Sequence, residues 1–181
     1  MKVLLKHLAV LLLLTVMFSF AACNDTDDGH FVEPVTLYEK VKGNWVLTEI
    51  TEIDETAKVS GIKPDEINLF EQFDFNSFRI SFDVDANNQP TSYKVSGNAP
   101  ELFPNNGYWD MSSPFPYTNG SAPVINLYSD ANKTTLTGQL SIVSVPGSKA
   151  EMDLKLTRSS AGVSFVSYQY KLSTPIQSNE E

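Results

Sequence analysis

The chain has 181 residues, 22 acidic side chains against 13 lysines and arginines, and a formal net charge of −9 at pH 7. This length suits one domain with a real core, and the acidic balance argues against nucleic acid, whose phosphates need Lys and Arg. Two histidines and one cysteine leave little material for Ser-His-Asp, Cys-His or His-based zinc chemistry. We therefore expect no catalytic residue, no metal and no cofactor.

The first element in chain order is a secretory signal over residues 1–22. It begins with two lysines, continues with an apolar run from Leu8 to Phe20, and ends in a pair of alanines. The run is too short for a membrane-spanning helix, and small side chains next to the cut are what a signal peptidase needs.

The cysteine follows directly, at Cys23. An alanine pair before a cysteine resembles the lipobox of bacterial lipoproteins, in which the thiol becomes diacylated, although Phe20 stands where Leu is usual. The alternative is an ordinary secretory cut with a free thiol, which is a liability in an exported protein. We expect lipidation at Cys23, which holds the protein on the outer membrane without spanning it.

An acidic tether follows, over residues 23–36. The run Asn-Asp-Thr-Asp-Asp-Gly is too polar and too short to bury surface. It resembles the surface-export signal of Bacteroidetes-type lipoproteins, and the alternative is a plain solvated linker. The resemblance implies exposure on the cell surface, and the linker alternative leaves the periplasmic face open.

The next region, residues 37–174, has the pattern of an all-β domain, followed by a polar tail over 175–181. Apolar residues recur with period two, and turn-rich segments separate the runs. This predicts an antiparallel meander that closes into a barrel of about eight strands, with a β-sandwich as the alternative. One short helix is expected to start at Pro64. The expected strands lie around 45–53, 78–84, 92–96, 108–111, 124–128, 136–142, 152–156 and 166–172.

The start of this domain narrows the choice of barrel. Leu37 and Val41 are spaced as in one helical turn, and Gly43-Asn-Trp45 then opens the first strand. This resembles the G-x-W opening of lipocalin-type barrels, where the indole packs across the barrel end. Because it combines this opening with the lipobox and the acidic tether, the chain resembles the lipocalin-like lipoproteins of Bacteroidetes. This resemblance implies a fold but no activity.

The stretch 100–120 is rich in aromatic residues and prolines and is the candidate binding surface, because aromatic faces in loops stack on sugar rings or grip peptides. The alternative is that these rings belong to a barrel strand and its surroundings. We expect Trp45 to be core and Trp109 to lie nearer a binding surface. The candidate ligand-binding residues are Phe103, Tyr108, Trp109, Phe115 and Tyr117.

Two weaker candidates lie near these residues. Glu101 and Asp110 flank the aromatic stretch and could form the carboxylate pair of a glycosidase. The run from Asp83 to Asn88 imitates the start of a calcium loop but lacks its glycine and its bidentate glutamate, and a hairpin turn explains it equally well.

These observations predict a lipid-anchored cell-envelope protein that acts as a non-catalytic binding or accessory module in glycan or peptide capture. Its expected partners are the membrane, through Cys23, and an outer-membrane transporter or binding-protein complex. The alternative is a small glycan-cleaving enzyme that depends on carboxylates.

Overall fold

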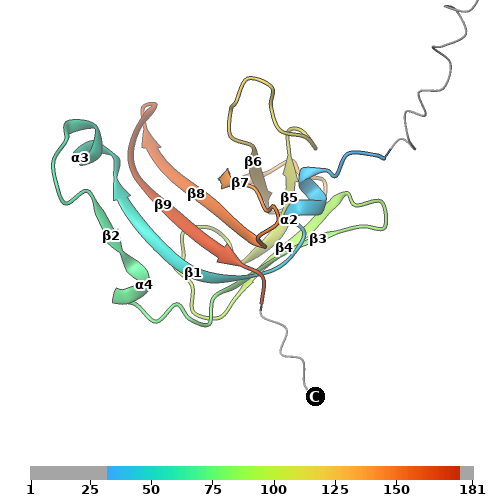
Figure 1. Cartoon of the computed structure of the whole chain (residues 1–181), viewed down its shortest axis with the longest axis horizontal. Coiled ribbons are helices and arrows are strands. Elements are labelled where there is room, and N and C mark those ends of the chain that lie inside the picture. Colours follow the sequence, from blue (N-terminus) through green and yellow to red (C-terminus); the bar gives the residue numbers. More distant parts are fainter. Residues whose placement is uncertain (1–31, 176–181) are drawn as a thin grey trace, which may run out of the picture. The chain divides into compact units, whose positions relative to one another are not determined.

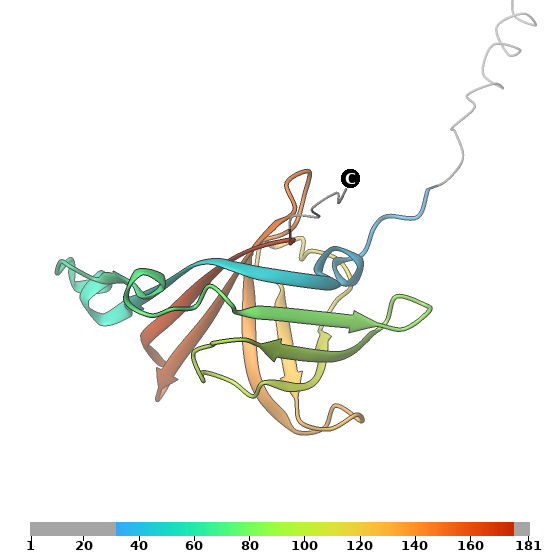
Figure 2. The same ribbon diagram turned by 90° about the horizontal axis from the view of Figure 1, so that it is seen from below.

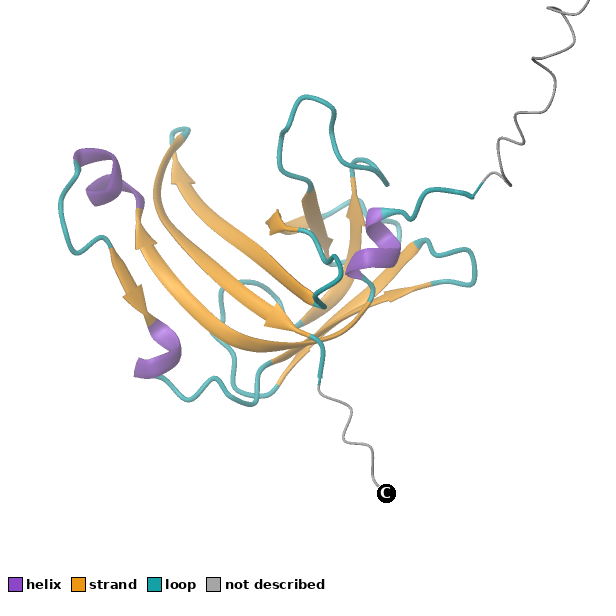
Figure 3. Ribbon diagram, viewed as in Figure 1, coloured by secondary structure: helices purple, strands orange, loops and turns teal. Residues whose placement is uncertain are grey.

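A computed structural model describes residues 32–175, so Cys23, the signal segment and the tail from residue 176 lie outside the described residues. The chain divides into two units, Met1–Pro34 and Val35–Glu181, and the second contains the helices and strands of the described region. Its described part is mainly strand (Figure 3). The elements are α2 (Leu37–Val41), β1 (Gly43–Asp54), α3 (Glu55–Ser60), β2 (Glu66–Asn68), α4 (Leu69–Gln72), β3 (Arg79–Val84), β4 (Pro90–Ser96), β5 (Asn106–Met111), β6 (Val124–Tyr128), β7 (Leu136–Ser144), β8 (Glu151–Ser160) and β9 (Val163–Ser173).

The strands form one antiparallel sheet that closes on itself (Figure 1). The order is β2-β1-β3-β4-β5-β6-β7-β8-β9, and β1 also pairs with β9 from Val46 to Asp54. That pairing closes eight strands into a barrel and leaves β2 as an extra strand on β1. The predicted meander and closed barrel are therefore confirmed, in a form consistent with a lipocalin-like fold, and the β-sandwich is excluded.

The period-two pattern explains why these segments are strands. In β3, Ile80 and Phe82 are buried, whereas Arg79 before them and Asp83 after them are exposed. Successive side chains of a strand point to opposite faces, so one face of each strand supplies the barrel core. Within the described residues the core is a single apolar cluster that draws on every barrel strand and on α2.

Helix α2 covers one end of the barrel, which we call the α2 end. Thr36 caps the helix: its hydroxyl accepts from the Glu39 amide at 3.2 Å, and the Glu39 carboxylate accepts in return from the Thr36 amide at 2.9 Å. This reciprocal pair satisfies two amides that a helix start leaves unpaired. The Thr36 hydroxyl also donates to the Glu39 carboxylate at 2.9 Å, and the two hydrogen bonds from Thr36, that of the amide first, lower the pKa of Glu39.

The first strand opens as the sequence predicted. Gly43 has φ +117, a conformation that favours glycine, and β1 begins there. Trp45 is 2% exposed and its indole N–H donates to the Val41 carbonyl at 2.8 Å. The prediction that Trp45 is a core residue at the barrel end is confirmed.

Trp109 lies in the core as well, in agreement with the alternative that it belongs to a barrel strand, and not nearer a binding surface. It is fully buried, its ring packs against Phe82 at 5.3 Å and Tyr38 at 6.1 Å between centroids, and its N–H donates to the Asp83 carbonyl at 2.8 Å. The reason is its position in β5, where strand alternation turns it inward.

The segment after Pro64 differs from the expected helix. Residues Glu66–Asn68 form β2, and only Leu69–Gln72 is helical, as α4. Strand β3 pairs with β1 only from Gly43 to Val46, so the distal part of β1 needs another partner on that edge. β2 supplies it by pairing with Thr51–Ile53, and this tertiary pairing overrides the local helix signal.

Strand β1 runs away from α2 and ends at α3, at what we call the far end of the barrel. Figure 2 shows α2 near one end of β1, and α3, β2 and α4 near the other. The turn between β8 and β9 lies at the far end too, because β9 pairs antiparallel with β1 up to Asp54. Among residues 32–175, none of the helices has the length and apolar character needed to cross a membrane.

Candidate binding site at the far end of the barrel

The inner face of the far end is built by β1, β8 and β9. Tyr170 stands opposite Leu154 and Ile50, and one step outward Tyr168 stands opposite Leu156 and Glu52. Residues paired across antiparallel strands point to the same face. The inner row is fully buried, whereas Tyr168 and Glu52 in the outer row are only half-buried. The face therefore passes from apolar core to polar surface within two rows of side chains.

The Tyr170 hydroxyl is the most unusual group in this region. Tyr170 is 2% exposed, and its ring lies 6.1 Å from that of Phe78 and 6.2 Å from that of Phe103. Among the described residues, its oxygen is the one buried side-chain N or O atom without a hydrogen-bond partner. Burial raises the pKa of Tyr170 well above its ordinary value, so the hydroxyl keeps its proton. An unsatisfied buried hydroxyl costs about 1–3 kcal/mol.

Polar side chains surround Tyr168 in the outer row. Burial raises the pKa of Tyr168 first, and the nearby negative Glu52 carboxylate raises it further. Arg158 opposes this shift, since its positive charge favours the ionised phenol. We call Glu52, Phe103, Arg158, Tyr168 and Tyr170 the far-end site.

Phe103 reaches the site from the connection between β4 and β5, residues 97–105. The Arg158 guanidinium donates to the Leu102 carbonyl, and the Tyr93 hydroxyl donates to the Pro104 carbonyl at 3.0 Å. Gly97 holds the start of this connection: a Cβ there would lie 1.9 Å from the Ser77 carbonyl oxygen. The connection is thus fastened on both sides of Phe103.

The structure separates the aromatic residues that the sequence nominated. Phe103 lies at the far end, whereas Phe115 and Tyr117 belong to the connection after β5, which bonds α2 through the Pro114 carbonyl and the Leu37 amide at 2.7 Å. The six residues of β5 lie between them, roughly 20 Å of strand. Tyr108, next to the inward Trp109, is half-buried on the outer face. The five rings do not form one surface.

Sequence reasoning missed Glu52, Arg158, Tyr168 and Tyr170. The two tyrosines alternate with polar residues in β9 as core residues do, and the charged residues look like ordinary surface charges. Only the pairing of β1 with β9 brings Glu52 beside Tyr168. The signal available in the sequence was a pair of tyrosines, each with a polar hydroxyl, at the positions of β9 that alternation assigns to the buried face.

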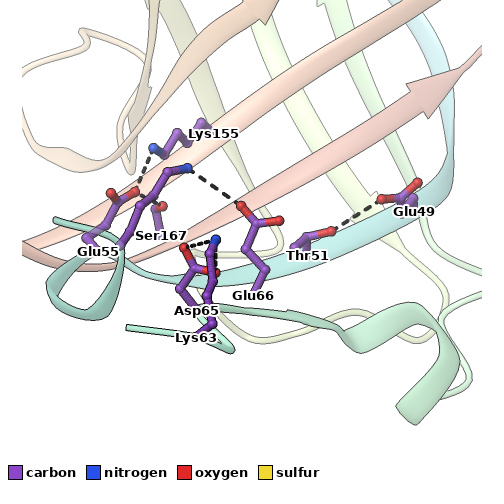
Figure 4. A network of polar contacts seen from close by, with 9 residues as sticks. Glu49, Thr51, Glu55, Lys63, Asp65, Glu66, Lys155 and Ser167 are labelled. Atoms are coloured by element: carbon purple, nitrogen blue, oxygen red, sulfur yellow. Dashed lines mark hydrogen bonds and ion pairs between the residues drawn. The ribbon is translucent and has the colours of Figure 1, made fainter. Parts of the chain in front are cut away.

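A polar network on the outer face holds α3 against the sheet (Figure 4). The Glu55 carboxylate accepts hydrogen bonds from the buried Ser167 hydroxyl and from Lys155, whose Nζ lies 2.7 Å away. These two hydrogen bonds, Lys155 first, lower the pKa of Glu55 despite its partial burial. Lys58 adds an ion pair to Glu66 at 3.6 Å. All these groups are mutually satisfied, so the network is a structural fastening rather than a site.

The nominated carboxylates have other partners or none. Asp110 accepts from Lys133 Nζ at 2.8 Å and from the Met111 amide at 2.8 Å, and Glu101 is exposed. The Asp85 carboxylate accepts from the Asn87 and Gln89 amides, both at 2.8 Å, as in a hairpin turn. In the described part of the chain, no group of three or more acidic, His or Cys side chains is placed to hold a metal ion.

A hollow of about 370 Å³ lies on the outer face where β8 begins and β9 ends. Its lining is Thr48, Glu151, Asp153, Lys171, Leu172 and Ser173. Lys171 pairs with Glu49 at 2.9 Å. This hydrogen bond first, and the negative charge of Asp153 in addition, raise the pKa of Lys171. This hollow has no aromatic face and no buried polar atom without a partner, so the far-end site is the better candidate.

The fold and the site together define a closed antiparallel β-barrel with a candidate binding surface at one end. Residues 19–173 match the family described as a domain of unknown function, DUF5004, and the chain belongs to that family. A search of curated proteins and a search of solved structures found no match. The matched range contains both Cys23 and the whole far-end site.

Proposed function

We propose that this protein is a lipid-anchored, non-catalytic binding module of the cell envelope. Cys23 after an alanine pair is the expected attachment point, and the outer membrane, facing outward, is the expected location, with the periplasmic face as the alternative. The acidic composition leaves the anchor as the main membrane contact. The resemblance of this chain to the lipocalin-like lipoproteins of Bacteroidetes supports this proposal.

The observation that carries the binding role is the Tyr170 hydroxyl. It is buried and has no partner among the residues that the structure describes, yet it lies at the end of the barrel where polar side chains begin. A ligand that brings a polar atom to this hydroxyl and an apolar surface to Phe103 would remove the cost of leaving it unpaired. Glycans and peptides both carry such groups, which fits nutrient capture beside an outer-membrane transporter or binding-protein complex.

We favour binding over catalysis because the nominated acids are not arranged as a pair. Asp110 is held by Lys133 and a backbone amide, and Glu101 lies exposed in the connection that carries Phe103. A glycosidase needs one carboxyl group on each side of the scissile bond. Sugar release from a polysaccharide panel that disappears in an Asp110→Asn or Glu101→Gln variant would overturn this preference.

Membrane attachment is tested by fractionation. Cys23→Ala should move the protein from the membrane fraction to the soluble fraction, and its continued membrane association would contradict the anchor. Protease treatment of intact cells separates the two faces, since only an outward-facing protein should be digested.

Binding is tested with a matched pair of variants. Phe103→Ala should weaken binding of the peptide or oligosaccharide that titration calorimetry identifies by about tenfold or more, the loss of one buried aromatic contact. Phe115→Ala, which removes an aromatic side chain 41% exposed at the α2 end, should leave it unchanged. Equal effects of the two variants would contradict a site at the far end.

A further inference from the structure

Strand β8 has an edge that the barrel leaves unpaired. It pairs with β9 along its whole length, from Glu151 to Ser160, but with β7 only from Asp153 to Lys155. Toward the far end this pairing stops where Ser141 stands opposite Lys155, and the register shift in β7 between Ile142 and Ser144 lies at the other end of the pairing. The five residues Leu156–Ser160 therefore have a strand partner on one side only, and Figure 1 shows β8 and β9 continuing together beyond β7.

This edge has only part of the usual protection against other strands. Natural edges are blunted by proline, by charged side chains, by bulges or by a covering segment. Leu156–Ser160 contains no proline and no lysine, and its one charged residue, Arg158, directs its guanidinium to the Leu102 carbonyl. A bulge after Arg158 bends only the last two residues. Within the described residues, no backbone group forms a hydrogen bond with the edge of this stretch that faces away from β9.

The unpaired edge borders the far-end site. Leu156 stands opposite Tyr168, and Arg158 stands opposite Val166, so both side chains point to the inner face. An incoming strand on this edge would lie beside Tyr168 and would direct alternate side chains toward Phe103 and Tyr170.

A segment of the chain itself shows which groups the site accepts. Residues 102 and 103 approach from another part of the sequence and bring one carbonyl and one flat apolar side chain: the Leu102 carbonyl meets Arg158, and the Phe103 ring meets Tyr170. A peptide has a backbone carbonyl at every residue and can carry an apolar side chain beside it. A glycan has neither a carbonyl in its backbone nor apolar side chains, so the contacts favour the peptide.

We propose that the far-end site binds an extended peptide that adds as a strand to the free edge of β8, Leu156–Ser160. The peptide places an apolar side chain beside Phe103 and a polar group at the Tyr170 hydroxyl. This inference rests on the proposed binding function and names its ligand class. Five residues of edge span about 16 Å, enough for two or three peptide side chains on the inner face.

The probe is a linear peptide selected from a random twelve-residue library on the full-length Cys23→Ala protein, with its affinity measured by calorimetry. In an added strand, every second peptide amide faces β8. N-methylation of amides of that parity should weaken binding at least tenfold, and methylation of the other parity should leave it nearly unchanged. Amide hydrogens among residues 156–160 that exchange rapidly in the free protein should become protected with the peptide.

The outcomes separate this inference from the function on which it rests. Equal effects of both methylation patterns, or no protection at 156–160, overturn strand addition. If oligosaccharides bind and Phe103→Ala or Tyr170→Phe weakens them while no peptide binds, the far-end binding function stands and the peptide inference falls. If neither class of probe depends on Phe103 or Tyr170, both fall.

Discussion

The two ends of the barrel use aromatic side chains differently. At the α2 end, the indole N–H groups of Trp45 and Trp109 donate to backbone carbonyls at 2.8 Å, and the Tyr38 hydroxyl reaches the Met111 carbonyl at 3.5 Å. At the far end, Tyr170 is as deeply buried, yet its hydroxyl has no partner within residues 32–175. The large majority of buried polar groups in folded proteins are hydrogen-bonded. The exception at the far end is the observation on which the proposed binding function rests.

The largest expected effects belong to the α2 end. Trp45→Ala and Trp109→Ala should each lower the free energy of unfolding by about 3–5 kcal/mol, a large part of a domain's ~5–15 kcal/mol. Denaturant unfolding measures the loss, or soluble expression fails. Phe115→Ala, in the connection that bonds α2, is the control and should be nearly neutral because its side chain is 41% exposed. A Trp109→Ala variant with wild-type stability would contradict the position of Trp109 in the core.

A smaller effect is expected where α3 is fastened near the far end. Glu55→Gln should lower the free energy of unfolding at pH 7 by about 1–2 kcal/mol, because it weakens hydrogen bonds from Lys155 and Ser167. Glu101→Gln, an exposed acid, is the matched control.

The same variant has a pH signature. Since the folded pKa of Glu55 lies below its ordinary value of 4.5, its contribution is complete above pH 4.5 and is lost as the pH falls through the folded value. The difference between wild type and Glu55→Gln should therefore shrink in acid. A difference that stays constant from pH 7 to pH 3 would contradict the pairing.

A cap substitution tests the α2 end more gently. Thr36→Ala should cost about 1 kcal/mol, because the Glu39 amide loses its acceptor, whereas Thr36→Ser should keep most of the stability. Thermal unfolding compares the two variants. If both lower the melting temperature equally, the hydroxyl is not what holds the helix start.

Much of the barrel could be predicted from the sequence, because its determinants are local. Alternation in segments such as Phe78–Val84 sets the strands, and Gly43 with Trp45 marks the start of β1. Strand β2 could not be predicted, since it exists to pair with the part of β1 that β3 leaves free. Local preference carries no information about that pairing.

The candidate site was less predictable for the same reason. Phe103 was nominated because it lies in an aromatic stretch, yet that stretch extends along β5 to both ends of the barrel. Tyr170 has the sequence context of a core residue, and its missing partner is a property of the packed barrel. The pairing of β1 with β9 then brings Glu52 beside Tyr168, although the two residues lie over a hundred positions apart in the sequence.

The smallest expected effect tests the central claim most directly, through two buried tyrosines. Tyr93 is 1% exposed and its hydroxyl donates to the Pro104 carbonyl, whereas Tyr170 is 2% exposed and its hydroxyl has no partner among the described residues. Tyr93→Phe should lose about 0.5–1.5 kcal/mol of unfolding free energy. Tyr170→Phe should keep wild-type stability or exceed it, and should weaken ligand binding. If Tyr170→Phe loses as much stability as Tyr93→Phe, the hydroxyl is satisfied within the folded protein and is not held for a ligand.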